Sequence, residues 1–362
     1  MMNTKITEYI KKILSAQKAP LAMLMIFIIM LFFKTPFYTS YNLIDLVNSN
    51  STLLIIALGF TVVLVAGGVD LSVGGVMVVS GIIAIELINL NIAIPIAVMV
   101  SLLFGAGIGA INGYLTVYQK TEPFIITLGM GVLLTGVAQQ LTTARPVSCN
   151  NPDFVNLANY KLFGQVPVLV VVMIAVFIVI YWILRGTSFG RNCYAIGGDY
   201  EVAKYSGINV LPIKSLAFII SGLTAALAGV MLSSWLNSGN SIYGDTTALY
   251  IASAVVVGGT SFAGGIGGAF RSVIGIMFIG LLSNAFNMLG IDAYIQQLLV
   301  GLIIVGIICL DCYDRKLKRE KVQNMRRFRN LFSVNSSWKY PSFFNNLITC
   351  QSNNVCRSTT PH

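Results

Sequence analysis

One stretch of the sequence, Val65–Gly75, limits the possible fold more than any other. It reads V-A-G-G-V-D-L-S-V-G-G and separates two apolar runs, Leu53–Ala66 and Val73–Leu90, that are hydrophobic enough for a membrane. A continuous span has no use for these glycines or for a carboxylate at that depth, because irregular backbone persists in lipid only where protein or water covers it. Glycine-interrupted helices line the pathways of transporters. The stretch therefore predicts a broken helix beside a pathway, with Asp70 at its centre.

Hydrophobic stretches of spanning length recur along almost the whole chain. Of its 362 residues, 56% are hydrophobic and 10% are charged, and the mean hydropathy is +0.80. These values predict an all-α integral membrane protein, a polytopic bundle of about ten transmembrane helices with glycine-interrupted segments. Eight spans are the alternative, because the eighth candidate is too short to cross as a straight helix. The candidates are Pro20–Phe33, Ser51–Ala66, Val73–Leu90, Ile92–Val117, Pro123–Thr142, Val166–Leu184, Ile213–Trp235, Leu249–Val257, Gly267–Leu289 and Tyr294–Leu310.

The distribution of basic residues predicts how the chain lies in the membrane. A net charge of +10 would suggest nucleic acid in a soluble protein, but here the basic residues collect at both ends and in the central loop Arg185–Lys214. This positive-inside pattern places both termini in the cytoplasm and predicts a lipid partner and no nucleic acid. We expect a basic N-terminus over residues 1–19, the membrane domain over 20–313 and a basic tail over 314–362. The tail is expected to be disordered or loosely surface-bound; an out-of-frame read-through is the alternative, which sequencing of the coding region tests.

Glycine spacing predicts close packing of one helix. Gly105, Gly109 and Gly113 form two overlapping G-x-x-x-G steps on one helical face, which lets another backbone approach closely. This feature is structural and indicates nothing about substrate.

A weak internal repeat points to a second interruption of the helices. Aligning Gly67 and Gly68 with Gly258 and Gly259 places Asp70 on Ser261. Interrupted segments at corresponding positions of two halves are the best sequence indication of a transport pathway. Chance similarity between glycine-rich membrane segments is the alternative.

The central loop contains a pattern typical of a short capped helix. Asp199 is placed as an N-cap, Tyr200–Ser206 is long enough for two turns, and Gly207 fits the left-handed position after the helix. Such a helix on a basic cytoplasmic loop is a natural docking element for a soluble subunit; an ordinary connecting loop is the alternative. The candidate docking residues are Asp199, Glu201, Lys204, Ser206 and Gly207.

Several chemistries find no support in the sequence. The phosphate-loop pattern G-x-x-x-x-G-K-[ST] is absent, so any ATP hydrolysis must occur on a partner. The only histidine is His362 and the six cysteines are scattered, so we expect neither a metal site nor catalytic residues. A stand-alone ion-coupled transporter needs several intramembrane ionisable groups, and the spans offer little besides Asp70 and Glu86.

Four motifs in chain order resemble the permease family of bacterial sugar-importing ABC transporters, the ribose, xylose and galactose type. The resemblance extends from about Ser51 to Lys316. The motifs are G-G-V-D-L-S-V-G (Gly67–Gly74), P-F-I-I-T-L-G-M (Pro123–Met130), Y-A-I-G-G-D-Y-E-V-A-K-Y-S-G-I (Tyr194–Ile208) and V-V-V-G-G-T-S-F-A-G-G-I-G (Val255–Gly267).

The resemblance implies a permease in the bacterial inner membrane with three kinds of partner. These are a second permease subunit, cytoplasmic ATP-binding subunits and an extracytoplasmic sugar-binding protein. The chain itself is expected to bind no cofactor, since ATP is used by the partner. It departs from the family at Asp199, where asparagine is usual, and at Ala248 and Tyr250, which replace acidic residues. Because of these last two changes, we do not expect the family's usual external or pathway contacts at these two positions.

More than one role is open for each of the candidate pathway residues. Asp70, with help from Ser72, caps the helix that begins near Leu71, accepts hydroxyl hydrogen bonds from a passing sugar, or makes a gating contact. Trp235, Tyr243 and Tyr250 either stack on sugar rings or form an aromatic belt at the outer interface. The scarcity of ionisable groups in the spans favours a neutral, hydroxyl-rich substrate, with branched-chain amino acids as the alternative. The candidates are Asp70, Ser72, Gly67, Gly68, Gly258, Gly259, Trp235 and Tyr250.

Overall fold

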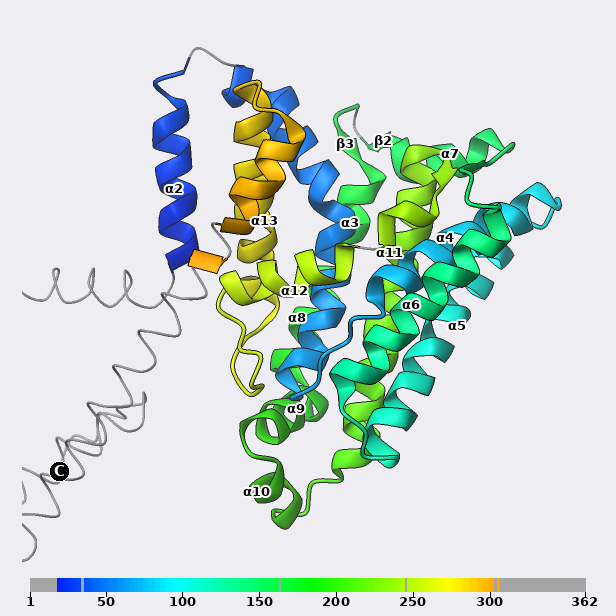
Figure 1. Ribbon diagram of the computed structural model, residues 1–362, viewed down its shortest axis with the longest axis vertical. Helices are drawn as coiled ribbons and strands as arrows, with labels where there is room; N and C mark the ends of the chain where they lie inside the picture. Colours follow the sequence, from blue (N-terminus) through cyan, green and yellow to red (C-terminus); the bar gives the residue numbers. More distant parts are fainter. Residues whose placement is uncertain (1–17, 34–35, 163, 245, 303–304, 307–362) are drawn as a thin grey trace, which may run out of the picture. The chain divides into compact units, whose positions relative to one another are not determined.

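The structure is a computed structural model that describes residues 18–33, 36–162, 164–244, 246–302 and 305–306. The predicted tail over residues 314–362, almost all of the predicted N-terminus over 1–19, and the end of the tenth candidate span lie outside the described residues. Within them the chain is a bundle of helices (Figure 1). Its longer helices are α2 (Lys18–Met30), α3 (Ser40–Val65), α4 (Val73–Asn89), α5 (Ile94–Gly113), α6 (Pro123–Thr142), α8 (Val168–Gly186), α11 (Val210–Leu236), α12 (Thr247–Val257) and α13 (Ala269–Met288).

Short elements connect these helices. Two antiparallel pairs of two-residue strands occur in the described part of the chain, β1 with β4 and β2 with β3, and they are minor additions to the predicted all-α fold. The connecting elements are η1 (Pro36–Tyr38), the π-helical turn η2 (Tyr114–Tyr118), β1 (Val147–Ser148), α7 (Pro152–Asn159), β2 (Lys161–Leu162), β3 (Val166–Pro167), α9 (Ser188–Gly198), α10 (Tyr200–Tyr205), β4 (Ser238–Gly239) and η3 (Ser241–Gly244).

Six described helices are long and apolar enough to cross a membrane: α3, α5 with η2, α6, α8, α11 and α13. The shorter apolar helices are α2, α4, α12 and a helix over Ala293–Leu302. Each predicted span therefore falls on a helix, and the multi-pass helical class is supported. The count of about ten crossings stays a prediction.

One predicted boundary is wrong. The span expected at Ser51–Ala66 begins at Ser40, because α3 carries polar residues through its first half. Asn42 is buried there and exchanges two amide hydrogen bonds with Asn284 of α13, at 3.1 and 2.9 Å. The amide pair satisfies these polar groups inside the bundle, and hydropathy alone does not reveal it.

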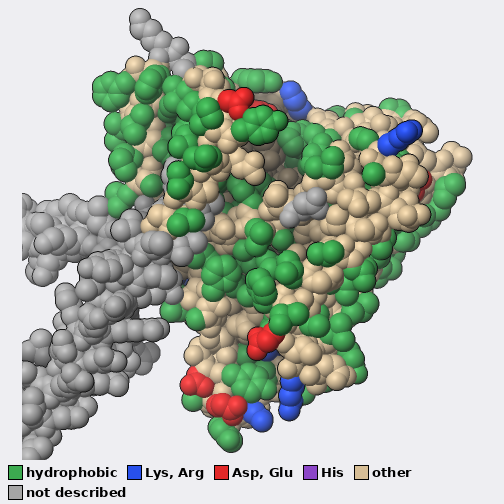
Figure 2. Space-filling view, in the orientation of Figure 1, with side chains coloured by type: hydrophobic (Ala, Val, Ile, Leu, Met, Phe, Trp, Pro, Cys, Tyr) green, Lys and Arg blue, Asp and Glu red, His purple; other side chains and the backbone are tan. Residues whose placement is uncertain are grey.

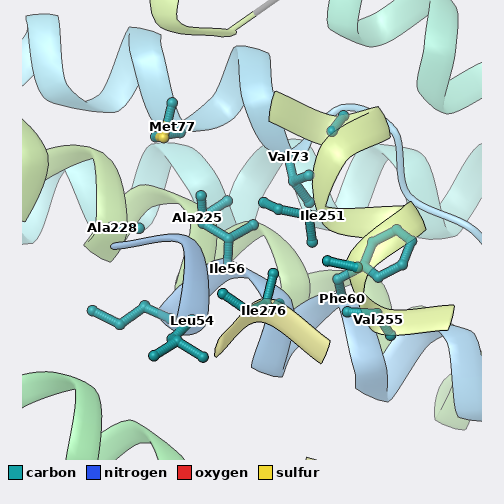
Figure 3. Packing of buried hydrophobic residues seen from close by; sticks show 14 of the residues in the cluster. Leu54, Ile56, Phe60, Val73, Met77, Ala225, Ala228, Ile251, Val255 and Ile276 are labelled. Atoms are coloured by element: carbon teal, nitrogen blue, oxygen red, sulfur yellow. The ribbon is translucent and has the colours of Figure 1, made fainter. Parts of the chain in front are cut away.

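The core lies where α11 meets α3, α4 and α5, the three helices against which it packs most extensively. Apolar side chains from α3, α4, α11, α12 and α13 interlock in one cluster (Figure 3). Helix α3 has 78% of its most apolar window buried, whereas α6 has 17%. The outer helices therefore present most of their surface to the surroundings, and the inner ones are enclosed by protein.

The predicted G-x-x-x-G face of α5 is confirmed as a packing face. A Cβ placed on Gly105 would lie 2.5 Å from the carbonyl oxygen of Gly222, and one on Gly109 would lie 2.4 Å from that of Phe218. Both partners belong to α11. The glycines thus let the two backbones approach within distances that any side chain would prevent.

The two ends of the bundle differ. Helices α9 and α10 lie at one end, and α7 with the strands β2 and β3 at the opposite end (Figure 1). On the face drawn in Figure 2, charged side chains gather towards the ends and an uncharged band lies between them. The end with α9 and α10 carries most of the described basic residues, namely Lys120, Arg185, Arg191, Lys204, Lys214 and Arg271.

Candidate transport pathway and coupling helix

The predicted helix break is present between α3 and α4. Helix α3 ends in a glycine-type C-cap, in which the Gly67 N–H donates to Leu64 O at 3.0 Å and the Gly68 N–H donates to Val63 O at 3.0 Å. Gly67 has φ +73°, the left-handed conformation that glycine adopts at low cost. The chain then runs irregularly to Val73, where α4 begins.

Asp70 lies fully buried in this break and organises a polar cluster. Its Oδ1 accepts the Ser72 N–H at 3.1 Å and the Ser72 hydroxyl at 2.6 Å. The amide of Asn112, on α5, donates to Ser72 Oγ at 2.8 Å. On the other side Thr127, on α6, accepts the Leu71 N–H at 3.0 Å. The carboxylate therefore holds the turn that leads into α4, whose N-cap residue is Ser72; the three interpretations of Asp70 stay predictions.

The cluster retains unused hydrogen-bonding capacity. Ser221 of α11 lies beside the Asp70 carboxylate. Asp70 Oδ2 and Asn112 Oδ1 have no hydrogen-bond partner of good geometry among the described residues. Buried polar oxygens usually have partners, so these two atoms are exceptions within the cluster.

The second glycine segment repeats the geometry of the first. Helix α12 ends with the same C-cap, in which the Gly259 N–H donates to Val256 O at 2.8 Å, and Gly259 has φ +98°. Ser261 accepts the N–H two residues further on, at Ala263, as Asp70 does at Ser72. In these two C-caps the left-handed glycines are Gly67 and Gly259, whereas the sequence alignment pairs Gly67 with Gly258. Other described helices end in the same way, so the internal repeat stays a prediction.

The predicted short helix of the central loop is confirmed as α10. Asp199 Oδ1 accepts the N–H groups of Glu201 and Val202, both at 3.1 Å, and Gly207 has φ +84° after the helix. Helix α10 exposes an apolar surface that the sequence analysis did not single out: Tyr205 is 85% exposed and Val202 60%. Contiguous exposed apolar surface can mark an interaction site, whereas single exposed apolar side chains are common, so the docking role of α10 stays a prediction.

The remaining candidates lie in less informative surroundings. Trp235 and Tyr250 are partly buried and pack against the main hydrophobic cluster, whereas Tyr243 is exposed. Glu86 lies in the last turn of α4 and is partly exposed. No cluster of three or more metal-binding side chains occurs in the described ranges.

Three polar residues of the Asp70 cluster were missed by the sequence analysis: Asn112, Thr127 and Ser221. They lie on α5, α6 and α11, whereas Asp70 lies in the break between α3 and α4. In the sequence each of them is a single polar residue within an apolar span. Such residues often bond only to the backbone of their own helix, so the sequence does not distinguish the two cases. Helix α9 was missed as well, because Ser188–Gly198 contains three glycines, which lower its helix propensity.

Six long apolar helices, helices interrupted at glycines, and a buried polar cluster between them define a multi-pass membrane protein of the transporter class. A family model described as branched-chain amino acid transport system / permease component matches residues 42–308. The chain belongs to this permease family of ABC transport systems, and within it to the sugar permeases.

The relatives support that placement. The ribose import permease protein RbsC of Haemophilus influenzae is 34% identical over 318 residues, which cover 86% of this chain and 98% of that protein. RbsC of Escherichia coli K12 is 33% identical over 306 residues, covering 84% and 95%. The D-allose transport system permease protein AlsC of Escherichia coli K12 is 34% identical over 276 residues, covering 76% and 84%. No solved structure matches the chain.

Proposed function

We propose that this chain is the membrane-spanning permease of an ATP-driven importer for a monosaccharide or a similar small neutral polyol in a bacterial inner membrane. The observation that carries the proposal is that curated relatives named for ribose, D-allose and L-arabinose transport align along most of the chain. The buried Asp70 cluster agrees with it, because oxygens that have no hydrogen-bond partner among the described residues can accept hydrogen bonds from sugar hydroxyl groups.

The proposed orientation places α9, α10 and both termini in the cytoplasm. The basic residues at the α9–α10 end favour this side by the positive-inside rule. Ten crossings follow if the shorter helices α2, α4 and α12 and the helix that begins at Ala293 also traverse the bilayer. Short helices are tolerated in a membrane where other helices surround them, as they surround α4.

The proposed mechanism is alternating access. Closure of ATP-binding subunits is transmitted through Asp199–Gly207, and the helices around Asp70 and around Gly258–Gly265 rearrange so that the pathway opens to one side at a time. The chain binds no cofactor, and ATP is consumed by its partner. The candidate pathway residues Asp70, Ser72, Gly67, Gly68, Gly258, Gly259, Trp235 and Tyr250 keep that role as a proposal.

The extracytoplasmic sugar-binding protein docks, in this proposal, at the end opposite α10. An open hollow of about 610 Å3 lies there, and four of its lining residues are asparagines, Asn89, Asn91, Asn150 and Asn151. The asparagines give this hollow a polar lining, as is usual for the rim of an interface. A second permease subunit completes the pathway.

Uptake measurements test the substrate class. In the native bacterium with the chromosomal copy deleted and then restored, labelled D-ribose, D-allose, L-arabinose and L-leucine are supplied in turn. We expect restored uptake of one or more sugars and unchanged uptake of L-leucine. Restored L-leucine uptake without any sugar uptake would contradict the proposal.

A pull-down tests the role of α10. Full-length permease is purified from detergent-solubilised native membranes as wild type, as Tyr205→Ala and as Tyr160→Ala. Tyr160 is the matched control, an exposed tyrosine beside α7 and β2. We expect a phosphate-loop ATPase, identified by mass spectrometry, with wild type and Tyr160→Ala and a large loss with Tyr205→Ala. Equal recovery in all three would place the docking surface elsewhere.

A further inference from the structure

The two interrupted helices and the loop that carries α10 meet at one place, which we call the break junction. It consists of Val65–Gly68 after α3, Gly197 at the end of α9, and Gly264–Gly268 before α13. We propose that the break junction transmits movement of α10 to both interrupted helices together, with Gly197, Tyr194 and Lys214 as positioning residues. The inference rests on the proposed docking of an ATPase at α10.

Backbone contacts hold the centre of the break junction. The Gly265 N–H donates to Val65 O at 3.0 Å, so the loop before α13 bonds directly to the end of α3. A Cβ on Gly197 would lie 2.0 Å from Val65 O and 2.5 Å from the Gly265 nitrogen. A Cβ on Gly264 would lie 2.8 Å from the Gly67 Cα. Three segments far apart in the sequence therefore touch through their main chains, with no side chain between them.

Two side chains tie the rim of the break junction to α9 and α11. Lys214, in the first turns of α11, donates from Nζ to Gly67 O at 3.2 Å. The Tyr194 hydroxyl, on α9, donates to Gly267 O at 3.0 Å. Burial raises the pKa of Tyr194 above its ordinary value, against the lowering effect of Arg185 and Arg271, so the hydroxyl keeps its proton. Each interrupted segment thus receives one bond from the elements that flank α10.

Helix α10 has little freedom to move without α9. Asp199 alone separates the two helices; its N–H donates to Ala195 O in α9 at 3.1 Å while its side chain caps α10. Ile196, Ala203 and Val210, from α9, α10 and α11, form a small hydrophobic cluster of their own. A force applied at α10 therefore reaches Gly197 through packed atoms.

The physical argument is that close-packed backbone cannot be compressed. Contacts of this kind either stay in place or shift as a unit, so a displacement of Gly197 moves Val65 and Gly265 with it. Glycine is required because any Cβ at Gly197 would push the three segments apart. Both helix breaks then respond to one event at the docking helix.

The test compares two neighbouring glycines. Gly197→Ala places a methyl group against Val65 O, whereas the methyl group of Gly198→Ala meets no atom of the described residues within 4 Å. Full-length permease is assayed for recovery of the ATPase from native membranes, for ATP hydrolysis by the purified complex, and for uptake of labelled D-ribose, D-allose and L-arabinose by cells. We expect Gly197→Ala to retain the ATPase and its hydrolysis while uptake falls by about 5- to 150-fold, the usual range of coupling between sites. Gly198→Ala should behave as wild type.

A second variant protects the test against misfolding. Tyr194→Phe combined with Lys214→Met removes both rim bonds without adding an atom to the break junction. We expect ATP hydrolysis to continue while sugar uptake falls, so more ATP is consumed for each sugar imported; loss of a merely structural bond would lower both together. Full uptake in the double variant, or in Gly197→Ala, would overturn the inference. Absence of any ATPase with wild-type permease would instead overturn the proposed docking at α10.

Discussion

Replacement of Gly109 by alanine offers a direct measure of how tightly α5 packs on α11. A Cβ at this position would lie 2.4 Å from the Phe218 carbonyl oxygen and 2.8 Å from the Ile219 Cα, whereas ordinary contact begins at 3.4 Å. Both neighbours are backbone atoms and cannot turn aside. The two helices must therefore separate by about 1 Å in the Gly109→Ala variant, at the overpacking cost usual for a filled interior.

The size of the effect follows from a comparison with Gly107 on the same helix. A Cβ at Gly107 meets no atom of the described residues within 4 Å, so Gly107→Ala gains only the better helix propensity of alanine, about 1 kcal/mol. Gly109→Ala gains the same propensity but loses about 1–3 kcal/mol to overpacking. The difference in stability between the two variants therefore isolates the helix–helix contact.

The assay is thermal unfolding of the purified permease in detergent, measured as the loss of the monodisperse peak in size-exclusion chromatography. All variants are heated at one rate, because membrane proteins of this size unfold irreversibly. We expect the midpoint of Gly109→Ala to lie roughly 2–8 °C below that of Gly107→Ala. Coincident midpoints would refute the close approach of α5 and α11.

Two further predictions concern the coupling helix and the helix break. Asp199→Ala removes the cap of α10, worth about 1 kcal/mol, and should lower recovery of the ATPase in the pull-down. Asp199→Asn keeps a capping oxygen and should restore recovery of the ATPase. Equal loss of the ATPase with both variants would mean that the charge of Asp199 matters, and not its cap. Ser72→Ala removes the hydroxyl that joins Asp70 to Asn112 and should cost about 1–3 kcal/mol, seen as a lower thermal midpoint. Ser80→Ala is its control, since the buried Ser80 hydroxyl has no hydrogen-bond partner among the described residues; equal shifts in the two serine variants would argue against the cluster.

Features that depend on neighbours in the sequence were predicted well. Helix α6 has the predicted bounds, Pro123–Thr142, because a proline at its first position and an unbroken apolar run mark it clearly. The cap and the terminating glycine of α10 were recognisable for the same reason, since Asp199 and Gly207 act on residues within three positions.

Features that depend on contacts between distant segments were not predictable. The start of α3 was missed because part of the hydrogen bonding of its buried amide, Asn42, is supplied by Asn284 on the distant α13. Capping was one of three interpretations of Asp70, and none of them included Asn112 and Thr127, which reach its turn only once α5 and α6 have packed beside it. The sequence placed Gly67 and the later glycine segment in corresponding halves, and did not reveal that Gly67 and Gly264 are adjacent in space.

The shortness of α4 has a consequence for how the protein responds to its lipids. At 1.5 Å per residue, its 17 residues extend about 25 Å, less than the hydrocarbon thickness of about 30 Å. Because α4 packs against α5, α6, α11 and η3 and is buried along most of its length, it adjoins protein and not acyl chains. A thicker or thinner bilayer therefore acts on the rim formed by α5, α6 and α8, while the helix that carries the Asp70 turn is shielded from hydrophobic mismatch.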